Sequence, residues 1–257
     1  MRFRANPKHD VSIVCIFREE APFLDEWIKF HVSMGVSHFY LYNNFSTDAF
    51  QEVLKPYLEQ KLVSFYDWPV EVGQLAAYRH CVKKHAMDTR WMAFIDVDEF
   101  LFAPDCRPLG VVLSEYSDHP GVVVHSPYFG SAGHRKRPPV PITKAFTMRA
   151  SLSKTSAKTV ANPRWIYAIR NVHLFKYWAN VGVSTDGREF DPETVYLDKL
   201  RLNHYWSRSL DDLSDKIARG DASTSTKRDP EWHFQFEKSL NQERDVSIMA
   251  CLDKAFP

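Results

Sequence analysis

The stretch Trp91-Met-Ala-Phe-Ile-Asp-Val-Asp-Glu-Phe-Leu-Phe102 decides how the rest of the chain is interpreted. Five apolar residues come first, then a short acidic segment that contains Asp96, Asp98 and Glu99, and then three more apolar residues. A short apolar run of this kind predicts a buried strand. The carboxyl end of that strand should therefore present negative charge in a cleft.

The spacing of the first two acids points to a metal ion. Asp96 and Asp98 are two residues apart, so in an extended chain their side chains leave the same side of the backbone and Val97 faces the other way. Carboxylates this close repel each other unless a cation lies between them, and a hard divalent cation prefers oxygen ligands. Many Asp-x-Asp pairs in surface loops are simply solvated. The position directly after an apolar strand favours metal binding over a solvated turn.

Length and composition narrow the class of protein. A chain of 257 residues has room for one large α/β domain or two small ones, and we expect one domain with a small appendage. The net charge of +1 gives no reason to expect nucleic-acid binding. Aromatic residues make up 14% of the chain, which suits either an aromatic core or stacking platforms for sugars.

The cysteines and the N-terminal residues lead to expectations about the cellular compartment of the protein. Four cysteines, none in a Cys-x-x-Cys pair, suggest reduced thiols rather than a disulfide framework or a zinc site: Cys15, Cys81, Cys106 and Cys251. The first ten residues lack an apolar signal segment, and no run of eighteen apolar residues occurs. We therefore expect a cytoplasmic chain without a transmembrane segment. Peripheral membrane association stays open, and a domain cut from a longer membrane-anchored protein would look the same.

Strands and helices alternate through the first hundred residues. Apolar runs predict strands over 11–17, 38–42, 62–67 and 91–95, and helical spacing predicts helices over 23–34, from 48 to about 57, and 74–87. This alternation is typical of a doubly wound parallel sheet that binds its ligand at the carboxyl ends of the strands. No Gly-x-Gly-x-x-Gly follows the first strand, which argues against a dinucleotide fold and a P-loop.

The pattern changes after Phe102, where prolines divide the chain into shorter pieces. The sequence predicts later strands over 122–126, 145–150, 169–177 and 199–206, a helix from Leu210 onwards, and a polar, mobile segment over 223–229. The basic run 135–137 is expected to be a solvated loop, or a phosphate contact at the edge of a cleft, rather than a nucleic-acid site.

Four ordered segments, 18–31, 42–48, 91–102 and 203–209, resemble glycosyltransferases of the family 92 type and their bacterial relatives in the family-2-like group. The resemblance runs from about Val11 to Ala222. It implies an α/β fold of the GT-A type with a doubly wound mixed sheet. The implied divisions are a glycosyltransferase domain over 1–208, made of a Rossmann-like nucleotide-binding half (about 8–104) and an acceptor and metal-completing half (about 105–208), and a helical C-terminal appendage over 209–257.

The resemblance also implies an activity. Such proteins transfer a sugar, often galactose, from a nucleotide-sugar donor, commonly UDP-linked, to a glycan or other hydroxyl acceptor, with Mn²⁺ or Mg²⁺ and with inversion. Two rival functions stay open: a metal-dependent nucleotidyltransferase and a non-catalytic carbohydrate-binding protein.

Site residues follow from the same resemblance. The donor would be bound by Phe17, Arg18, Glu20, Asn44, Asp48, Gln74, Arg79 and Asp96. The metal would be bound by Asp98 and His204, with Asp96 on the metal or the ribose. His173 is a second choice of histidine, and a buried imidazole bonded to backbone is the alternative for both. Residues placed near the donor or acceptor sugar are Phe129, Gly130 and His134.

An inverting transfer also needs a carboxylate that takes the proton from the acceptor hydroxyl. Candidates lie on the polar loop before the last predicted strand and in the segment after His204, and we select Glu189, Asp191 and Asp215, with Asp186 and Asp221 as further members of the same groups. Each of them could instead be an ordinary exposed carboxylate.

Overall fold

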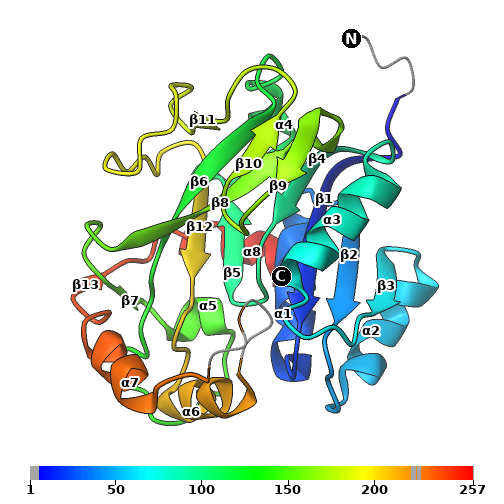
Figure 1. The fold of residues 1–257 in the computed structure, drawn as a ribbon. Helices are drawn as coiled ribbons and strands as arrows, with labels where there is room; N and C mark the ends of the chain where they lie inside the picture. The colour runs from blue at the N-terminus through cyan, green and yellow to red at the C-terminus, as the bar shows by residue number, and fades with distance from the viewer. Residues whose placement is uncertain (1–5, 221–223, 225–226, 257) are drawn as a thin grey trace.

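The computed structural model describes residues 6–220, 224 and 227–256. Its main element is a seven-stranded sheet in the order β11-β6-β8-β4-β1-β2-β3 (Figure 1). The strands of this sheet are β1 His9–Phe17, β2 His38–Asn43, β3 Val63–Asp67, β4 Thr89–Phe94, β6 Gly121–Pro127, β8 Thr155–Ala161 and β11 Val183–Ser184. Three two-stranded sheets accompany it: β5 Glu99–Phe102 with β12 Arg201–His204, β7 Met148–Arg149 with β13 Glu243–Arg244, and β9 Ile166–Ile169 with β10 Phe175–Tyr177.

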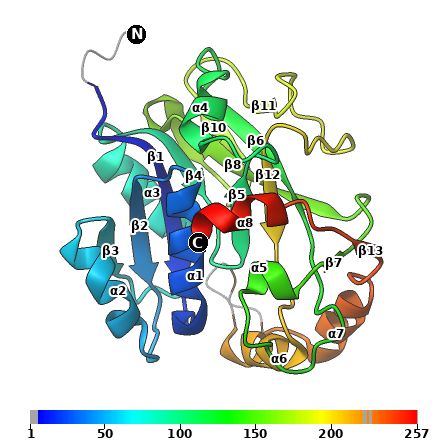
Figure 2. The same ribbon diagram turned by 180° about the vertical axis from the view of Figure 1, so that it is seen from behind.

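Helices cover both faces of the main sheet. They are α1 Ala21–Ser33, α2 Phe50–Glu59, α3 Gln74–His85, α4 Leu109–Ser114, α5 Ile142–Ala145, α6 Leu210–Arg219, α7 Pro230–Lys238 and α8 Met249–Ala255, with a 3-10 turn η1 at Pro163–Trp165. Alternate residues of β1 point to opposite faces, so Ile13 joins the core beneath α1, α2 and α8, and Val14 joins the core beneath α3 and β9. The view from behind shows α1 and α8 side by side on one face (Figure 2).

The sheet is parallel in its first half and mixed in its second. β1 pairs in parallel with β2 and β4, and β2 pairs in parallel with β3, as the alternation predicts. β8 runs antiparallel between β4 and β6, and β11 is parallel to β6. This is the doubly wound mixed sheet of the GT-A fold. The sequence analysis missed β8, because a strand that buries Lys158 lacks the continuous apolar run that marks a central strand.

The small β5–β12 sheet forms the functional edge. The chain leaves β4, passes through Asp96 and Asp98, and then pairs antiparallel with β12, so that Glu99 lies opposite His204. Trp27 of α1 fixes this turn from behind, because its Nε1 donates to the Glu99 carbonyl at 2.8 Å. The acidic residues are therefore held between two strands and a buried helix.

Two of the later predicted strands are wrong in detail. The segment 169–177 begins with the last residue of β9, turns, and ends with β10, which pairs antiparallel with β9. The chain turns because Asn171 Oδ1 accepts the backbone N–H groups of His173 and Leu174. In the segment 145–150 only β7 is a strand. Ala145, the first residue of this segment, is instead the last residue of helix α5. That helix begins at Ile142, where the carboxylate of Glu26 accepts the first free N–H groups.

The expectation of four reduced thiols is also wrong. Cys106 and Cys251 form a disulfide across a sequence separation of 145 residues, whereas Cys15 and Cys81 are free and buried. The spacing along the chain gave no sign of this bond because packing of α8 against α1 brings the two cysteines together. Disulfides persist mainly in oxidising compartments. The cytoplasmic location stays a prediction, and the disulfide counts against it.

No helix within the described part of the chain is long and apolar enough to cross a membrane. The segment 223–229, expected to be polar and mobile, falls partly outside the described residues.

Candidate functional site

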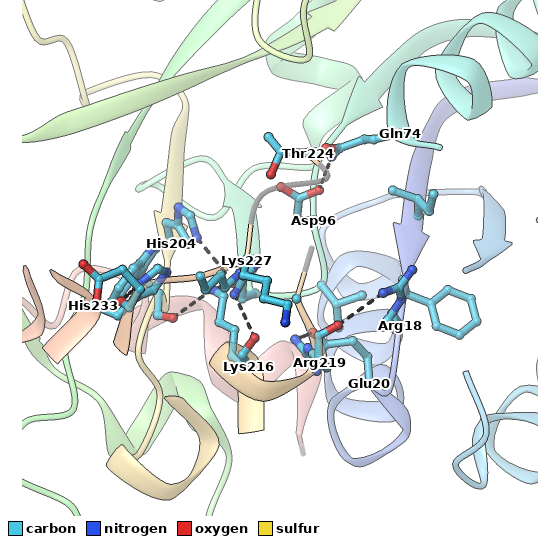
Figure 3. A pocket seen from close by; sticks show the side chains of 18 of the residues that line it. Arg18, Glu20, Gln74, Asp96, His204, Lys216, Arg219, Thr224, Lys227 and His233 are labelled. Atoms are coloured by element: carbon cyan, nitrogen blue, oxygen red, sulfur yellow. Dashed lines mark hydrogen bonds and ion pairs between the residues drawn. The ribbon is translucent and has the colours of Figure 1, made fainter. Parts of the chain in front are cut away.

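A cavity of about 520 Å³ opens at the carboxyl ends of β1 and β4, beside β12 and beneath α6 and α7 (Figure 3). Parallel strands expose the ends of their backbones and their following loops at one edge, which is where doubly wound sheets bind ligands. Seven of the residues selected from the sequence line it: Phe17, Arg18, Glu20, Gln74, Asp96, Asp98 and His204.

Asp96 lies between a buried cation and an amide. Lys158 Nζ donates to Asp96 Oδ2 at 2.6 Å, and Gln74 Nε2 donates to Asp96 Oδ1 at 2.8 Å. Burial would lower the pKa of Lys158, but the charges of Asp96 and Glu99 raise it well above the ordinary lysine value. Asp96 is therefore held in one orientation, with its carboxylate facing the cavity.

Asp98 lies against a second lysine and a histidine. Lys216 Nζ donates to Asp98 Oδ2 at 2.6 Å, and His204 Nε2 lies 3.4 Å from the same oxygen. Burial opposes ionisation of Asp98, but the positive charge of Lys216, together with contributions from the nearby His204 and Arg208 side chains, outweighs it and holds the pKa of Asp98 well below its usual range. Asp98 is consequently a carboxylate at neutral pH and can bind a cation.

Glu99 is buried behind the pair and has a different role. Its Oε2 accepts the backbone N–H of Asp96 at 2.9 Å, and its Oε1 lies 3.5 Å from His204 Nδ1. Burial raises the pKa of Glu99 to about 7, although Lys158 at 3.6 Å opposes this. A carboxylate behind one imidazole nitrogen is the usual way to direct the other nitrogen toward a metal ion.

Asp98 and His204 are donors of the kind that a divalent cation binds, and Lys216 Nζ occupies Asp98 Oδ2 in this structure. Asp98 Oδ2 and His204 Nε2 are 3.4 Å apart, close to the spacing of neighbouring ligands whose bonds to one cation are about 2.2 Å. Within residues 6–220, 224 and 227–256, no three His, Cys, Asp or Glu side chains converge as one metal cluster. A cation held by Asp98 and His204 would thus need further ligands from a bound phosphate group and water.

A buried ion-pair network forms the other wall of the cavity. The carboxylate of Glu20 accepts a hydrogen bond from Arg208 Nη1 at 2.7 Å and also forms an ion pair with Arg219. Arg18 Nε donates to the carbonyl of Asn44 at 2.8 Å. The network ties the loops after β1 and β2 to α6, and it places the guanidinium group of Arg208 near the carboxylate of Asp98.

Other residues selected from the sequence support the cavity without lining it. Asn44 is buried and donates to the carbonyls of Trp68 and Val70, and Asp48 accepts the Ala21 N–H at the start of α1. Arg79 donates to the Ile169 carbonyl on the face covered by α3. Their proposed contacts with a donor stay predictions.

The glycine-containing segment after β6 lies behind β12 rather than in the cavity. Phe129 is buried and packs against the ring of Tyr205, with centroids 5.0 Å apart. A side chain at Gly130 would collide with Asn241, so this glycine permits close packing of two protein segments. The carbonyl of His134 accepts the N–H of Leu210 at the start of α6. Roles for these residues near a sugar stay predictions.

The carboxylates selected as bases lie outside the cavity lining. Glu189 and Asp191 are exposed on the loop after β11, and Asp191 bonds to Thr194. Asp215 is exposed on α6, next to Lys216. The second-choice histidine, His173, directs its Nδ1 to the carbonyl of Ala157.

Sequence reasoning missed most of the cationic and aromatic lining. The missed lining residues are Trp206, Lys216, Arg219, Trp232 and His233, and Lys158, which is buried behind Asp96, was missed as well. The helical spacing after Leu210 did predict α6, but no local signal indicated that α6 lies over the ends of β1 and β4.

A doubly wound mixed sheet that closes against a small antiparallel sheet at its acidic edge gives the chain the architecture of the GT-A fold class. The sequence model described as glycosyltransferase family 92 matches residues 11–247. The chain belongs to this family, as the four sequence segments predicted.

Several relatives are similar to this chain. A glycosyltransferase family 92 protein of Oryza sativa subsp. japonica is 30% identical over 227 residues, which cover 82% of this chain and 36% of that protein. The galactan beta-1,4-galactosyltransferase GALS2 of Arabidopsis thaliana is 34% identical over 106 residues, which cover 36% of this chain and 20% of that protein. The chain spans about a third of the length of the first curated relatives that it matches.

Among solved structures, S. aureus TarS 1-349 in complex with UDP aligns with a TM-score of 0.41 and 12% identity, covering 61% of this chain and 47% of that chain.

Proposed function

We propose that this chain transfers a hexose from a UDP-linked donor to a hydroxyl group of a glycan, with a divalent cation and with inversion at the anomeric carbon. One observation carries the proposal: Asp96, Asp98 and His204 all line one cavity at the carboxyl edge of the sheet. Family membership supports glycosyl transfer, and the galactosyltransferase among the relatives makes galactose the first sugar to test.

In this reaction the acceptor oxygen bonds to the anomeric carbon as the bond from that carbon to the UDP oxygen breaks. The acceptor hydroxyl loses its proton to a base, and UDP leaves with the bonding electrons. Mn²⁺ or Mg²⁺, held by Asp98 and His204, would supply positive charge that stabilises the departing diphosphate. Lys216 and Arg219 line the same cavity and would add to that charge.

The remaining side chains would position the reacting groups. Lys158 and Gln74 hold Asp96 toward the cavity, where it could accept hydrogen bonds from hydroxyl groups of the ribose. Glu99 lies behind Nδ1 of His204 and leaves Nε2 for the cation. Arg18 and the buried Glu20 network would form the nucleotide end of the cavity.

The base would be a carboxylate that reaches the acceptor hydroxyl group. β11 pairs with the start of β6, whereas Tyr128, just after the end of β6, bridges to His204. The loop that carries Glu189 and Asp191 follows β11. It therefore lies near the end of β6 that is farther from the cavity. Of the three carboxylates selected from the sequence, we retain Asp215 as the candidate to test, because its neighbour Lys216 lines the cavity.

The decisive experiment is calorimetric titration of UDP with and without Mn²⁺, repeated on Asp98→Ala and on the exposed control Asp118→Ala. We expect UDP binding that requires both Mn²⁺ and Asp98 and that the control variant retains. UDP-galactose and other UDP-sugars would then be assayed for hydrolysis and transfer. Full metal-dependent binding by Asp98→Ala would refute the metal assignment, and incorporation of nucleoside monophosphate into product would identify a nucleotidyltransferase.

A further inference from the structure

Aromatic side chains form the wall of the cavity that the proposed donor contacts do not use. Trp206, Trp232 and His233 line this wall, and Phe236 packs against both tryptophans. Trp206 follows His204 by two residues, so the wall begins beside the proposed cation ligands. In Figure 3, His233 and His204 lie on one side of the pocket and Arg18 on the other.

Trp232 is supported by protein but largely open to solvent. Its ring stacks on Phe236 with centroids 5.1 Å apart and an interplanar angle of 9°, yet 54% of the residue is exposed. Trp206 stacks on His233 at 5.4 Å, and Lys216 Nζ lies 5.2 Å from the centre of the Trp206 ring. The rings are thus held in fixed orientations before any ligand binds, and a fixed, exposed indole is well suited to stacking.

Polar groups accompany these rings. Asp229 lines the same cavity and caps the start of α7, where its Oδ1 accepts a hydrogen bond from the Glu231 N–H. His233 also lines the cavity, and its Nδ1 faces the carbonyl of Asp229 at 2.6 Å. A pyranose ring has an apolar C–H face and a rim of hydroxyl groups. An indole face beside a carboxylate and an imidazole matches both features.

We propose that Trp232, Trp206, His233 and Asp229 form the acceptor subsite, in which a pyranose ring of a neutral glycan stacks on Trp232. The inference rests on the proposed function, because it assigns the acceptor to the wall of the cavity opposite Arg18. Proximity to Asp98 and His204 would bring an acceptor hydroxyl toward the anomeric carbon of the donor. The carboxylate of Asp229 serves here as a hydrogen-bond acceptor for sugar hydroxyl groups.

The test is binding of defined oligosaccharides to the whole chain. Tetrasaccharides of β-1,4-galactan, β-1,4-xylan, β-1,4-mannan and β-1,4-glucan are titrated in the presence of UDP and Mn²⁺. The variants are Trp232→Ala, Trp232→Phe and the control Trp178→Ala, which removes a tryptophan that is 72% exposed on the segment after β10. We expect at least one tetrasaccharide to bind wild type and Trp178→Ala equally and to bind Trp232→Ala about tenfold more weakly, as loss of one stacked ring predicts. Trp232→Phe should recover part of the affinity, and every variant should still bind UDP.

Two outcomes would overturn the subsite alone. One is equal tetrasaccharide affinity in wild type and Trp232→Ala. The other is wild-type protein that binds UDP and Mn²⁺ but none of the four tetrasaccharides. Wild-type protein that binds neither UDP nor any tetrasaccharide would contradict the proposed function itself, and the subsite with it.

Discussion

The Nδ1 atom of His204 lies 3.5 Å from Oε1 of Glu99, because the two residues are register partners in the β5–β12 pair. Neither atom has a hydrogen-bond partner among the described residues. The contact between Glu99 and His204 links β5, which follows the acidic residues, to β12, which carries the histidine. It gives Glu99 an orienting role and leaves the carboxylates of Asp96 and Asp98 to face the cavity.

Glu99→Gln should weaken binding of the cation without removing a ligand. Loss of an orienting carboxylate behind a metal-bound histidine typically costs about 10–100-fold in metal affinity. We expect a decrease of this size in a Mn²⁺ titration, and Asp118→Asn serves as the control because that carboxylate is exposed. Unchanged Mn²⁺ affinity in a folded Glu99→Gln protein would show that Glu99 does not act through His204.

Lys158→Met should strongly destabilise the fold. Lys158 is only 3% exposed and pairs with Asp96 and Glu99, so its removal leaves buried negative charge without a partner. Breaking a buried pair in this way costs about 3–5 kcal/mol in the free energy of unfolding. Urea denaturation measures the loss, and Lys154→Met on the exposed turn before β8 is the matched control.

The double variant Lys158→Met with Glu99→Gln distinguishes a charge effect from a packing effect. It should be more stable than Lys158→Met alone above pH 7, because the second substitution removes a carboxyl group that must otherwise take up a proton to stay buried. If the double variant were less stable than either single variant, packing rather than charge would explain the result.

Acid should destabilise the protein through His31. Its Nε2 accepts the N–H of Leu101 at 3.0 Å, so the ring proton is on Nδ1 and is donated to the Trp27 carbonyl. Burial lowers the pKa of His31 to about 3, from 6.5 in the unfolded chain. The unfolded state therefore binds more protons between these values. The stability from the neutral ring is complete above pH 6.5 and is lost as pH falls toward 3, at about 1.4 kcal/mol per pH unit.

Unfolding free energies measured from pH 7 to pH 4 would test the role of His31. His31→Leu should be less stable at pH 7, because it loses both hydrogen bonds, but its stability should fall less steeply with acid. His119→Gln, on the turn between α4 and β6, should keep the wild-type slope. The same slope in all three proteins would assign the acid dependence to other groups.

The disulfide between Cys106 and Cys251 should stabilise the packing of α8. It closes a loop of 145 residues, and disulfides typically contribute about 2–4 kcal/mol by restricting the unfolded chain. Cys251→Ser should therefore lower the melting temperature, and a reducing agent should lower that of the wild type to a similar value. The Cys81→Ser variant provides a free-thiol control, and a wild-type melting temperature insensitive to reduction would contradict the prediction.

The sequence by itself determined the first half of the sheet, its acidic edge and the family. Those features depend on local patterns: apolar runs for β1, β2 and β4, helical spacing for α1 and α3, and the acids that follow β4. Each pattern is complete within about ten residues, so it can be recognised before the chain folds.

Tertiary structure alone decided what surrounds those acids. Lys158 and Lys216 lie 62 and 118 residues from their partners Asp96 and Asp98, and the ring of Trp232 reaches the cavity from a helix near the end of the chain. The local sequence around a lysine does not indicate which carboxylate it will pair with in the folded protein. Sheet order and helix packing select these partners, because burial of an unpaired charge costs more than the fold can tolerate.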